Sequence, residues 1–277
     1  MIRQPDLNPE GVEWDAAAGQ FLVGSLGNGK VYAITDEGVA TPLVEDDAVK
    51  VAVGIEVDAK GGRLLVCSSE REAFTNPLAK TKIALGIYDL KTGERLHLVD
   101  LTKIGGESRH FANDVAVDGE GNAYVTDSTQ PHIYKVTPNG EASLFVKDAR
   151  FQNPFLGLNG IVAHPDGYLL VALAGGGKLY KITLEAAPVV TEVTLRQAER
   201  FDGLILTPEG VLIGVSSGRV IRLESDDAWA TATMTGEAKK HPATTVAYRD
   251  GEVYALWAHL SENPQPEAYE LVRVVFP

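Results

Sequence analysis

Several features that define other protein classes are absent from this chain. Its one cysteine, Cys67, excludes an intramolecular disulfide, and its six histidines show no metal-ligand spacing. No segment approaches the roughly 20 apolar residues of a membrane-spanning helix, and the first residues lack the apolar core of a signal peptide. We therefore expect a soluble, cytoplasmic protein, although a signal peptide removed from the given sequence would leave the same pattern.

Positive charge is also scarce. The chain has 25 Lys and Arg against 38 Asp and Glu, a formal net charge of −13. This balance disfavours nucleic acid and anionic membranes as partners and favours a bound cation. The one GxSxG match, GVSSG at residues 214–218, lies in a repeat strand and not in a strand-to-helix elbow, which disfavours a serine hydrolase of that type. We expect a monomer that acts on a small-molecule substrate.

The segment of residues 111–136 reads FANDVAVDGEGNAYVTDSTQPHIYKV. Apolar and polar residues alternate in three short runs, and GEGN between the first two is a turn signal. The segment is typical of an antiparallel meander. Similar units begin at residues 10, 53, 113, 159, 202 and 244. Their starts are roughly 40 to 50 residues from one another, except for one longer interval.

Six such units predict an all-β fold, a six-bladed β-propeller of four-stranded antiparallel blades that forms one domain over residues 1–277. The long second interval predicts an insertion over one face of the disc. The last unit has only three clear strands. We expect the residues before residue 10 to supply its outer strand and close the ring.

The first position of each unit falls on the strand that lines the channel of a propeller. Those positions hold Glu10, Val53, Asn113, Asn159, Asp202 and Thr244. Two carboxylates and two amide oxygens would therefore converge there. Such oxygen donors suit a hard cation, so the sequence predicts one divalent metal ion, Ca²⁺ in the first place, with Mg²⁺, Mn²⁺ or Zn²⁺ as alternatives.

Aromatic and cationic residues precede several of these positions. Arg109, His110 and Phe111 lie just before Asn113, and Phe155 lies before Asn159. We predict that these four residues contact the substrate at the mouth of the channel. Packing between blades is the alternative for each Phe.

Four motifs carry a resemblance to a known family. They are EGVEWD at residue 10, FANDVAVDGEGNAYVTDS at residue 111, LNGIVAHPDGYLLVA at residue 158 and FDGLILTPEGVLIGVSSGRVIRL at residue 201. Together they resemble the senescence marker protein 30, gluconolactonase and luciferin-regenerating enzyme family. The resemblance implies a six-bladed propeller with a divalent cation, usually calcium, in its channel.

The family's metal ligands fall on Glu10, Asn113, Asn159 and Asp202, the same residues that the repeat brings together. Many members carry a substrate-contacting arginine two residues before the ND motif. Here that position is Phe111, which leaves recognition of a sugar lactone open. Glu13 has a counterpart in Glu56; these two either face water between blades or bind a second, structural ion.

The resemblance implies a metal-dependent hydrolase, most simply a lactonase or esterase whose cation polarises the carbonyl of a small cyclic ester. Asp202 and Asn113 are the predicted catalytic residues, with Asp202 orienting or deprotonating the attacking water. Three alternatives stay open: a strictosidine-synthase-like enzyme, a phosphotriesterase-like enzyme, and a non-catalytic binding propeller of the NHL type.

Overall fold

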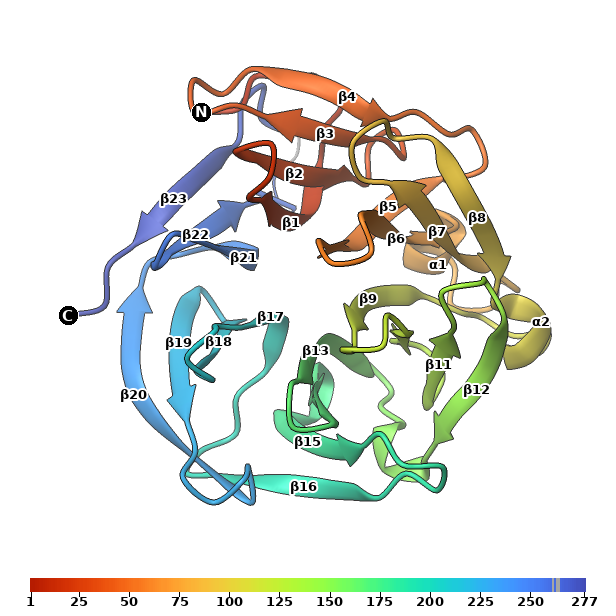
Figure 1. Cartoon of the computed structure of the whole chain (residues 1–277), viewed down its shortest axis with the longest axis vertical. Helices are drawn as coiled ribbons and strands as arrows, with labels where there is room; N and C mark the ends of the chain where they lie inside the picture. The colour runs from red at the N-terminus through yellow and green to blue at the C-terminus, as the bar shows by residue number, and fades with distance from the viewer. Residues whose placement is uncertain (261, 263–264) are drawn as a thin grey trace.

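A computed structural model describes residues 1–260, 262 and 265–277. It is an all-β ring of six blades around a central channel (Figure 1), which confirms the predicted fold class. The inner strands contact one another in the order β1, β5, β9, β13, β17, β21 and back to β1, so the ring is closed. Within the described part of the chain, no helix is long and apolar enough to cross a membrane.

Each of the first three blades is a four-stranded antiparallel sheet whose strands follow one another in chain order. Blade 1 contains β1 (Pro9–Asp15), β2 (Gln20–Ser25), β3 (Val31–Ile34) and β4 (Ala40–Val44). Blade 2 contains β5 (Val51–Asp58), β6 (Arg63–Ser69), β7 (Ile83–Asp89) and β8 (Arg95–Asp100), with the short helix α1 (Glu72–Thr75) between β6 and β7. After helix α2 (Thr102–Gly105), blade 3 contains β9 (Ala112–Val117), β10 (Ala123–Asp127), β11 (His132–Val136) and β12 (Ala142–Lys147).

The second half of the ring follows the same plan, with two short 3₁₀ helices, η1 (Ala149–Phe151) and η2 (Ala174–Gly176). Blade 4 contains β13 (Leu158–His164), β14 (Tyr168–Leu173), β15 (Lys178–Thr183) and β16 (Val190–Leu195). Blade 5 contains β17 (Phe201–Leu206), β18 (Leu212–Ser216), β19 (Arg219–Glu224) and β20 (Thr231–Lys239). Blade 6 contains β21 (Ala243–Arg249), β22 (Glu252–Trp257) and β23 (Glu270–Val274).

Two details differ from the prediction of six separate four-stranded blades. The outer strands β16 and β20 pair in parallel at Thr194 and Leu195, which joins blades 4 and 5 into one eight-stranded sheet. Blade 6 has three strands among the described residues. The N-terminal segment does reach this blade, but only through one antiparallel bridge between Ile2 and Tyr269. The predicted contact is therefore present, whereas the predicted fourth strand is not.

The turn between the first and second strand of every blade uses a glycine with positive φ, a conformation that other residues adopt at a cost. These glycines are Gly19, Gly62, Gly121, Gly167, Gly210 and Gly251. The strands they connect are rich in Val, Ile, Leu and Tyr, which favour a pleated and half-buried surface.

The hydrophobic core is divided among the interfaces between neighbouring blades. Six clusters of buried side chains fill the six interfaces, from the one between blades 1 and 2, around Leu22 and Val66, to the one between blades 6 and 1, around Phe21 and Leu256. No blade could bury both of its faces alone, so stability depends on completing the ring.

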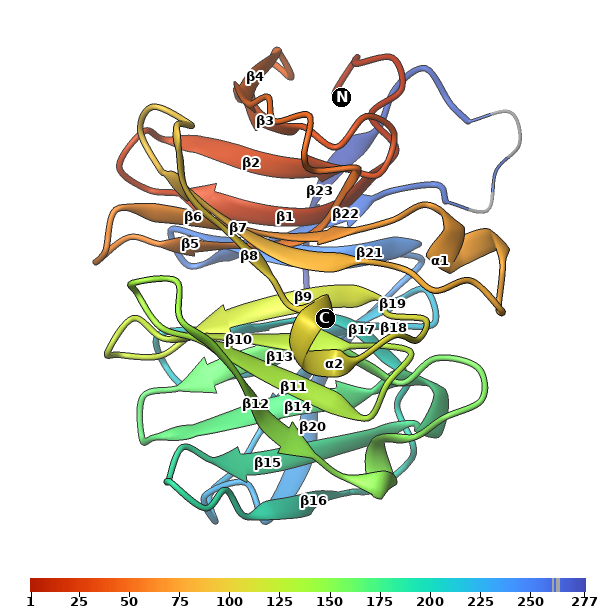
Figure 2. The same cartoon turned by 90° about the vertical axis from the view of Figure 1, so that its right-hand side faces the viewer.

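The two faces of the disc differ. We call the face on which the inner strands begin the entrance face, and the opposite one, with the turns between first and second strands, the turn face. Helix α1 follows β6, whose last residue Ser69 pairs with Val51 at the start of β5. The predicted insertion therefore lies over the entrance face, at the right of Figure 2.

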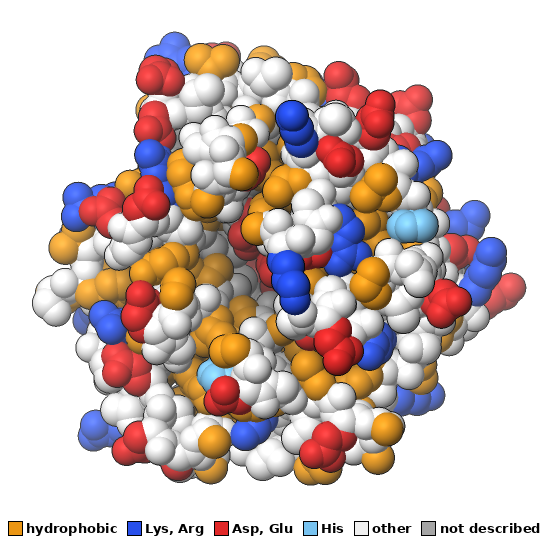
Figure 3. Space-filling view, in the orientation of Figure 1, with side chains coloured by type: hydrophobic (Ala, Val, Ile, Leu, Met, Phe, Trp, Pro, Cys, Tyr) orange, Lys and Arg blue, Asp and Glu red, His pale blue; other side chains and the backbone are white. Residues whose placement is uncertain are grey.

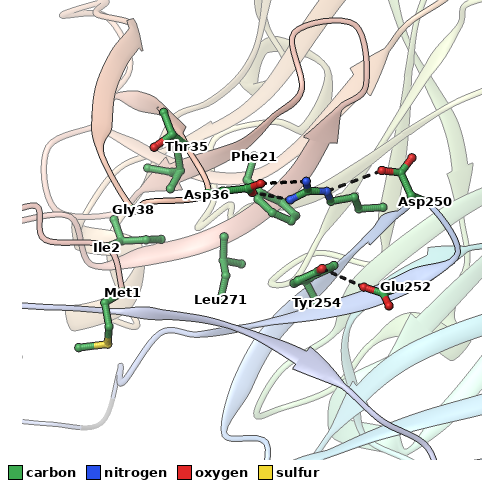
Figure 4. Close-up of a pocket in the computed structure, with 12 residues that line it drawn as sticks. Met1, Ile2, Phe21, Thr35, Asp36, Gly38, Asp250, Glu252, Tyr254 and Leu271 are labelled. Atoms are coloured by element: carbon green, nitrogen blue, oxygen red, sulfur yellow. Dashed lines mark hydrogen bonds and ion pairs between the residues drawn. The ribbon is translucent and has the colours of Figure 1, made fainter.

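The seam between the first and last blades is joined by an ion pair. Arg249 on β21 binds Asp36 beyond β3, and its guanidinium lies 4.3 Å from the ring centre of Trp14. A surface pocket of about 400 Å³ lies beside this pair (Figure 4). None of the predicted metal-binding residues lines this pocket, so it belongs to the closure of the ring.

Candidate functional site

Each inner strand carries a β-bulge at the position that the repeat places in the channel. Pairing of the first two strands shifts register at Glu10, Val53, Asn113, Asn159, Asp202 and Thr244. A bulge adds one residue to a strand and re-aims its side chain. The six positions are therefore equivalent in structure as well as in sequence.

A glycine follows the bulged residue in four blades because the inner strands approach one another too closely for a side chain. A Cβ atom on Gly11 would lie 2.6 Å from the carbonyl oxygen of Val53, and one on Gly54 would lie 2.5 Å from that of Asn113. Gly160 and Gly203 are equally confined. Gly160 and Gly203 lie in strands, so Asn159 and Asp202, which precede them, are strand residues and not turn residues.

Four of the residues at the bulged positions have side-chain oxygen atoms that accept no hydrogen bond from any described residue. We call Glu10, Asn113, Asn159 and Asp202 the oxygen ring. The Nδ2 of Asn159 donates to Oδ1 of Asp202 over 2.9 Å, and the Nδ2 of Asn113 donates to Oγ of Ser128 over 2.9 Å. The amide oxygens of both Asn residues, the second oxygen of Asp202 and the carboxylate of Glu10 have no such donor.

The cavity at the channel centre is small. Its volume is about 20 Å³, and it is lined by Glu10, Asn113, Asn159 and other residues of the inner strands of all six blades. That space is close to what one water molecule needs, so it fits a single ion and no organic molecule. Among the described residues, no three His, Cys, Asp or Glu side chains are grouped as a metal site. A cation here would therefore need the two amide oxygens as well as the two carboxylates.

The electrostatics of the ring also fit a cation. Burial raises the pKa of Asp202 to about 6, while the hydrogen bond from Asn159 opposes that rise. The pKa of Glu10 is raised well above its usual value, first by burial and then by the negative charges of Asp202 and Asp114. Carboxylates this close together repel one another, and a divalent cation between them would relieve the repulsion.

A second group of carboxylates lies further along the channel. We call Glu13, Glu56 and Asp114 the turn-side carboxylates; all three line the same cavity. Both oxygens of Asp114 accept backbone hydrogen bonds, from Val115 over 2.9 Å and from Ile161 over 3.1 Å. Burial raises the pKa of Asp114 to about 7 and that of Glu13 to about 8, and it also raises the pKa of Glu56. Glu13 and Glu56 thus face the channel, not water between blades.

His110, which we predicted to contact the substrate, is fully buried. Its Nδ1 lies 2.6 Å from Oδ2 of Asp127, and its Nε2 lies 2.8 Å from the carbonyl oxygen of Gly106 and 3.0 Å from Oγ of Ser108. Burial alone would lower the pKa of His110, but the bonds to Asp127 and Gly106 raise it overall. In this structure the imidazole fixes the loop before β9 and offers no surface to a ligand.

The other three predicted substrate contacts lie apart from the central cavity. Phe111 is buried and packs edge-on against Phe74 of α1, with ring centres 4.7 Å apart. Arg109 is half-buried, and its backbone carbonyl accepts from Oγ1 of Thr129. Phe155, on the loop before β13, is 88% exposed. Of the four, Phe155 is therefore the most accessible to a ligand at the entrance face.

The turn face also has a hollow near its centre (Figure 3). A pocket of about 660 Å³ lies among the turns of blades 2, 3 and 4 and includes Glu56, Lys60 and Arg63. Arg63 is paired with Asp58, and Nζ of Lys60 donates to the carbonyl of Gly119. These groups connect neighbouring turns, and the pocket contains none of the ring residues.

The sequence did not reveal two residues of the site. Asp114 enters the channel beside Asn113 because both lie in one bulge, which alternation with a period of two cannot show. Ser128 holds the amide of Asn113. Only its place directly after the second strand of the repeat could have drawn attention to it.

Comparisons with known proteins identify one matching family model and several solved structures with a similar fold. Residues 8–251 match the family model described as SMP-30/Gluconolactonase/LRE-like region. No curated protein matches the chain significantly.

Solved structures share the fold at low sequence identity. The Malassezia sympodialis allergen Mala s 1 is 19% identical with a TM-score of 0.81, and the match covers 99% of this chain and 95% of the allergen. A gluconolactonase from Xanthomonas campestris is 18% identical with a TM-score of 0.67, covering 100% and 88%. A luciferin-regenerating enzyme is 14% identical with a TM-score of 0.64, covering 96% and 89%.

Proposed function

Because the chain belongs to the SMP-30/gluconolactonase/LRE-like family, we propose that it is a hydrolase of small cyclic esters that depends on a divalent cation in the oxygen ring. One observation carries the proposal most directly. Glu10, Asn113 and Asn159, from three blades, line one cavity of about 20 Å³ with oxygen atoms that have no protein donor, and Asn159 holds Asp202 of a fourth blade beside them. Oxygen ligands of this kind suit Ca²⁺, which we propose as the first choice of metal.

When bound, the cation would act as a Lewis acid that polarises the ester carbonyl and stabilises the negative charge formed on attack by water. The ring residues provide the ligands: the carboxylates of Glu10 and Asp202 and the amide oxygens of Asn113 and Asn159. Asn159 also holds Oδ1 of Asp202 in place, which fixes the direction of Oδ2.

We propose that Asp202 orients the attacking water through Oδ2. With a pKa of about 6 in the cation-free protein, Asp202 is mostly ionised near neutral pH and can accept a hydrogen bond from water. Proximity to a cation would lower that pKa further, so the carboxylate would act more by orientation than as a base. Asn113, the other predicted catalytic residue, would bind the cation through its amide oxygen.

The size of the cavity restricts where the ester binds. Since about 20 Å³ holds one ion or water, the ring of the lactone must lie above the oxygen ring at the entrance face, with its carbonyl directed into the channel. Loops of several blades form that face, and Phe155 offers an exposed aromatic surface there. We propose a small lactone as the substrate.

Turnover by metal-free and metal-loaded protein tests the proposal. The protein is stripped with chelator, supplied with Ca²⁺, Mn²⁺ or Zn²⁺, and assayed on gluconolactone and on unsubstituted five- and six-membered lactones. We expect activity that disappears with the metal and returns with it. Metal binding without turnover of any lactone would contradict the substrate class. Absence of metal binding would contradict the site and favour a binding propeller.

A further inference from the structure

Ser128 connects two residues of consecutive blades at the oxygen ring. It follows the last residue of β10, and its side chain is buried. Its Oγ lies 2.5 Å from the carbonyl oxygen of Leu158 and 2.9 Å from Nδ2 of Asn113. Leu158 immediately precedes Asn159 in β13, so one hydroxyl links blade 3 to blade 4 beside two of the proposed ligands.

The hydrogen-bonding capacity of a hydroxyl decides which way the Asn113 amide points. A serine hydroxyl has one proton to donate and two lone pairs to accept with. A carbonyl oxygen can only accept, so the proton of Ser128 goes to Leu158. Toward Asn113, Ser128 can therefore only accept, and the atom that faces it must be the amide nitrogen. The amide oxygen is left on the channel side, where Asn113 lines the cavity.

We propose that Ser128 is a positioning residue that holds the amide oxygen of Asn113 toward the oxygen ring. This inference rests on the proposed cation site. With the amide reversed, the NH₂ group would face the ring, where a cation would repel it. Removing a hydrogen bond that orients a metal ligand typically lowers metal affinity by about 10- to 100-fold.

Ser69 provides a matched control in the neighbouring blade. Ser69 is the last residue of β6, the second strand of its blade, and Ser128 directly follows β10, the second strand of the next blade. The side chain of Ser69 is also buried. Its Oγ donates to the carbonyl oxygen of Ala112 over 3.1 Å, and Ala112 precedes Asn113 just as Leu158 precedes Asn159. Ser69 thus makes the same link between blades but makes no hydrogen bond to a ring side chain.

The experiment compares Ca²⁺ affinity, by calorimetry on chelator-stripped protein, in the wild type and in Ser128→Ala and Ser69→Ala. We expect Ser128→Ala to bind Ca²⁺ roughly 10- to 100-fold more weakly, and Ser69→Ala to bind within about threefold of the wild type. The Tm of the cation-free protein should fall in both variants, because each loses one hydrogen bond to a backbone carbonyl, and should fall further in Ser128→Ala, which also loses the hydrogen bond from Asn113.

Testing Ser128→Ala in the Asn113→Asp variant separates an effect on the orientation of the side chain at position 113 from an effect on protein stability. Aspartate at position 113 presents an oxygen in either orientation, so Ser128→Ala combined with Asn113→Asp should bind within about threefold of Asn113→Asp alone. Equal affinities of Ser128→Ala and Ser69→Ala would overturn the role of Ser128 and leave the cation site standing. A wild type that binds no Ca²⁺ would overturn the cation site and this role with it.

Discussion

The oxygen ring and the turn-side carboxylates occupy the same channel but differ in how their oxygens are satisfied. Both oxygens of Asp114 accept backbone hydrogen bonds, whereas Asp202 keeps one oxygen without a donor and Glu10 keeps two. Burial raises the pKa of Glu13 to about 8, so this side chain can remain neutral by holding a proton. The charge of buried acids can be removed by protonation or balanced by a cation, and we propose the first for the turn-side carboxylates and the second for the oxygen ring.

The largest expected effect comes from replacing a ring carboxylate. Asp202→Asn removes one of two anionic ligands, and we expect Ca²⁺ affinity to fall by more than roughly 100-fold and lactone turnover to be lost. Glu13→Gln is the control, because it removes a carboxylate from the same channel and should bind Ca²⁺ nearly as well as the wild type. Calorimetry and a lactone assay on both variants measure this. Turnover by Asp202→Asn at the wild-type rate would contradict the role of Asp202.

The second effect is the dependence of Ca²⁺ affinity on pH. In the cation-free protein burial and neighbouring charges raise the pKa of Glu10, and the pKa of Asp202 is about 6, so bound Ca²⁺ must displace protons from these groups as pH falls. We expect affinity to rise with pH between pH 5 and pH 8, by up to about tenfold per pH unit for each proton displaced. Titrations in buffers of different ionisation enthalpy count the protons. Affinity independent of pH would show that the ring carboxylates are not the ligands.

A smaller effect concerns the stability of the cation-free protein. The pKa of Glu13 is about 8 when folded, above the usual value for an unfolded chain, so the folded state holds more protons between those two values. Its contribution to stability is therefore complete below the unfolded pKa and is lost as pH rises through about 8. We expect Tm to fall from pH 5 to pH 8, and to fall less in Glu13→Gln.

Glu107→Gln, on an exposed loop, controls for the change in net charge in that measurement. It should follow the wild-type profile. A Glu13→Gln profile as steep as that of the wild type would contradict the assignment of a raised pKa to Glu13.

The smallest expected effect on stability belongs to Phe155. Because its side chain is 88% exposed, Phe155→Ala should change the free energy of unfolding by no more than about 0.5 kcal/mol. If the substrate binds at the entrance face, KM for the best lactone should rise several-fold while kcat and Tm stay constant. Phe111→Ala is the contrasting variant, since Phe111 is buried against Phe74 and its loss should lower Tm. An unchanged KM in Phe155→Ala would exclude its contact with substrate.

The sequence was sufficient for the fold because each blade repeats one pattern of alternation and turns. The same repeat located the four ring residues, since equivalent positions of a propeller meet at its axis. It could not show the bulges, because a bulge breaks the alternation from which strands are predicted. Asp114 was therefore not assigned to the channel. The burial of His110 depends on Asp127, a partner from the next strand that its own segment does not reveal.

The most direct test of the central claim is a crystal structure of the protein grown with Mn²⁺, in which anomalous scattering locates the ion. We predict a single peak in the channel, in contact with Glu10, Asp202 and the amide oxygens of Asn113 and Asn159. A peak among Glu13, Glu56 and Asp114, or no peak in the channel, would contradict it.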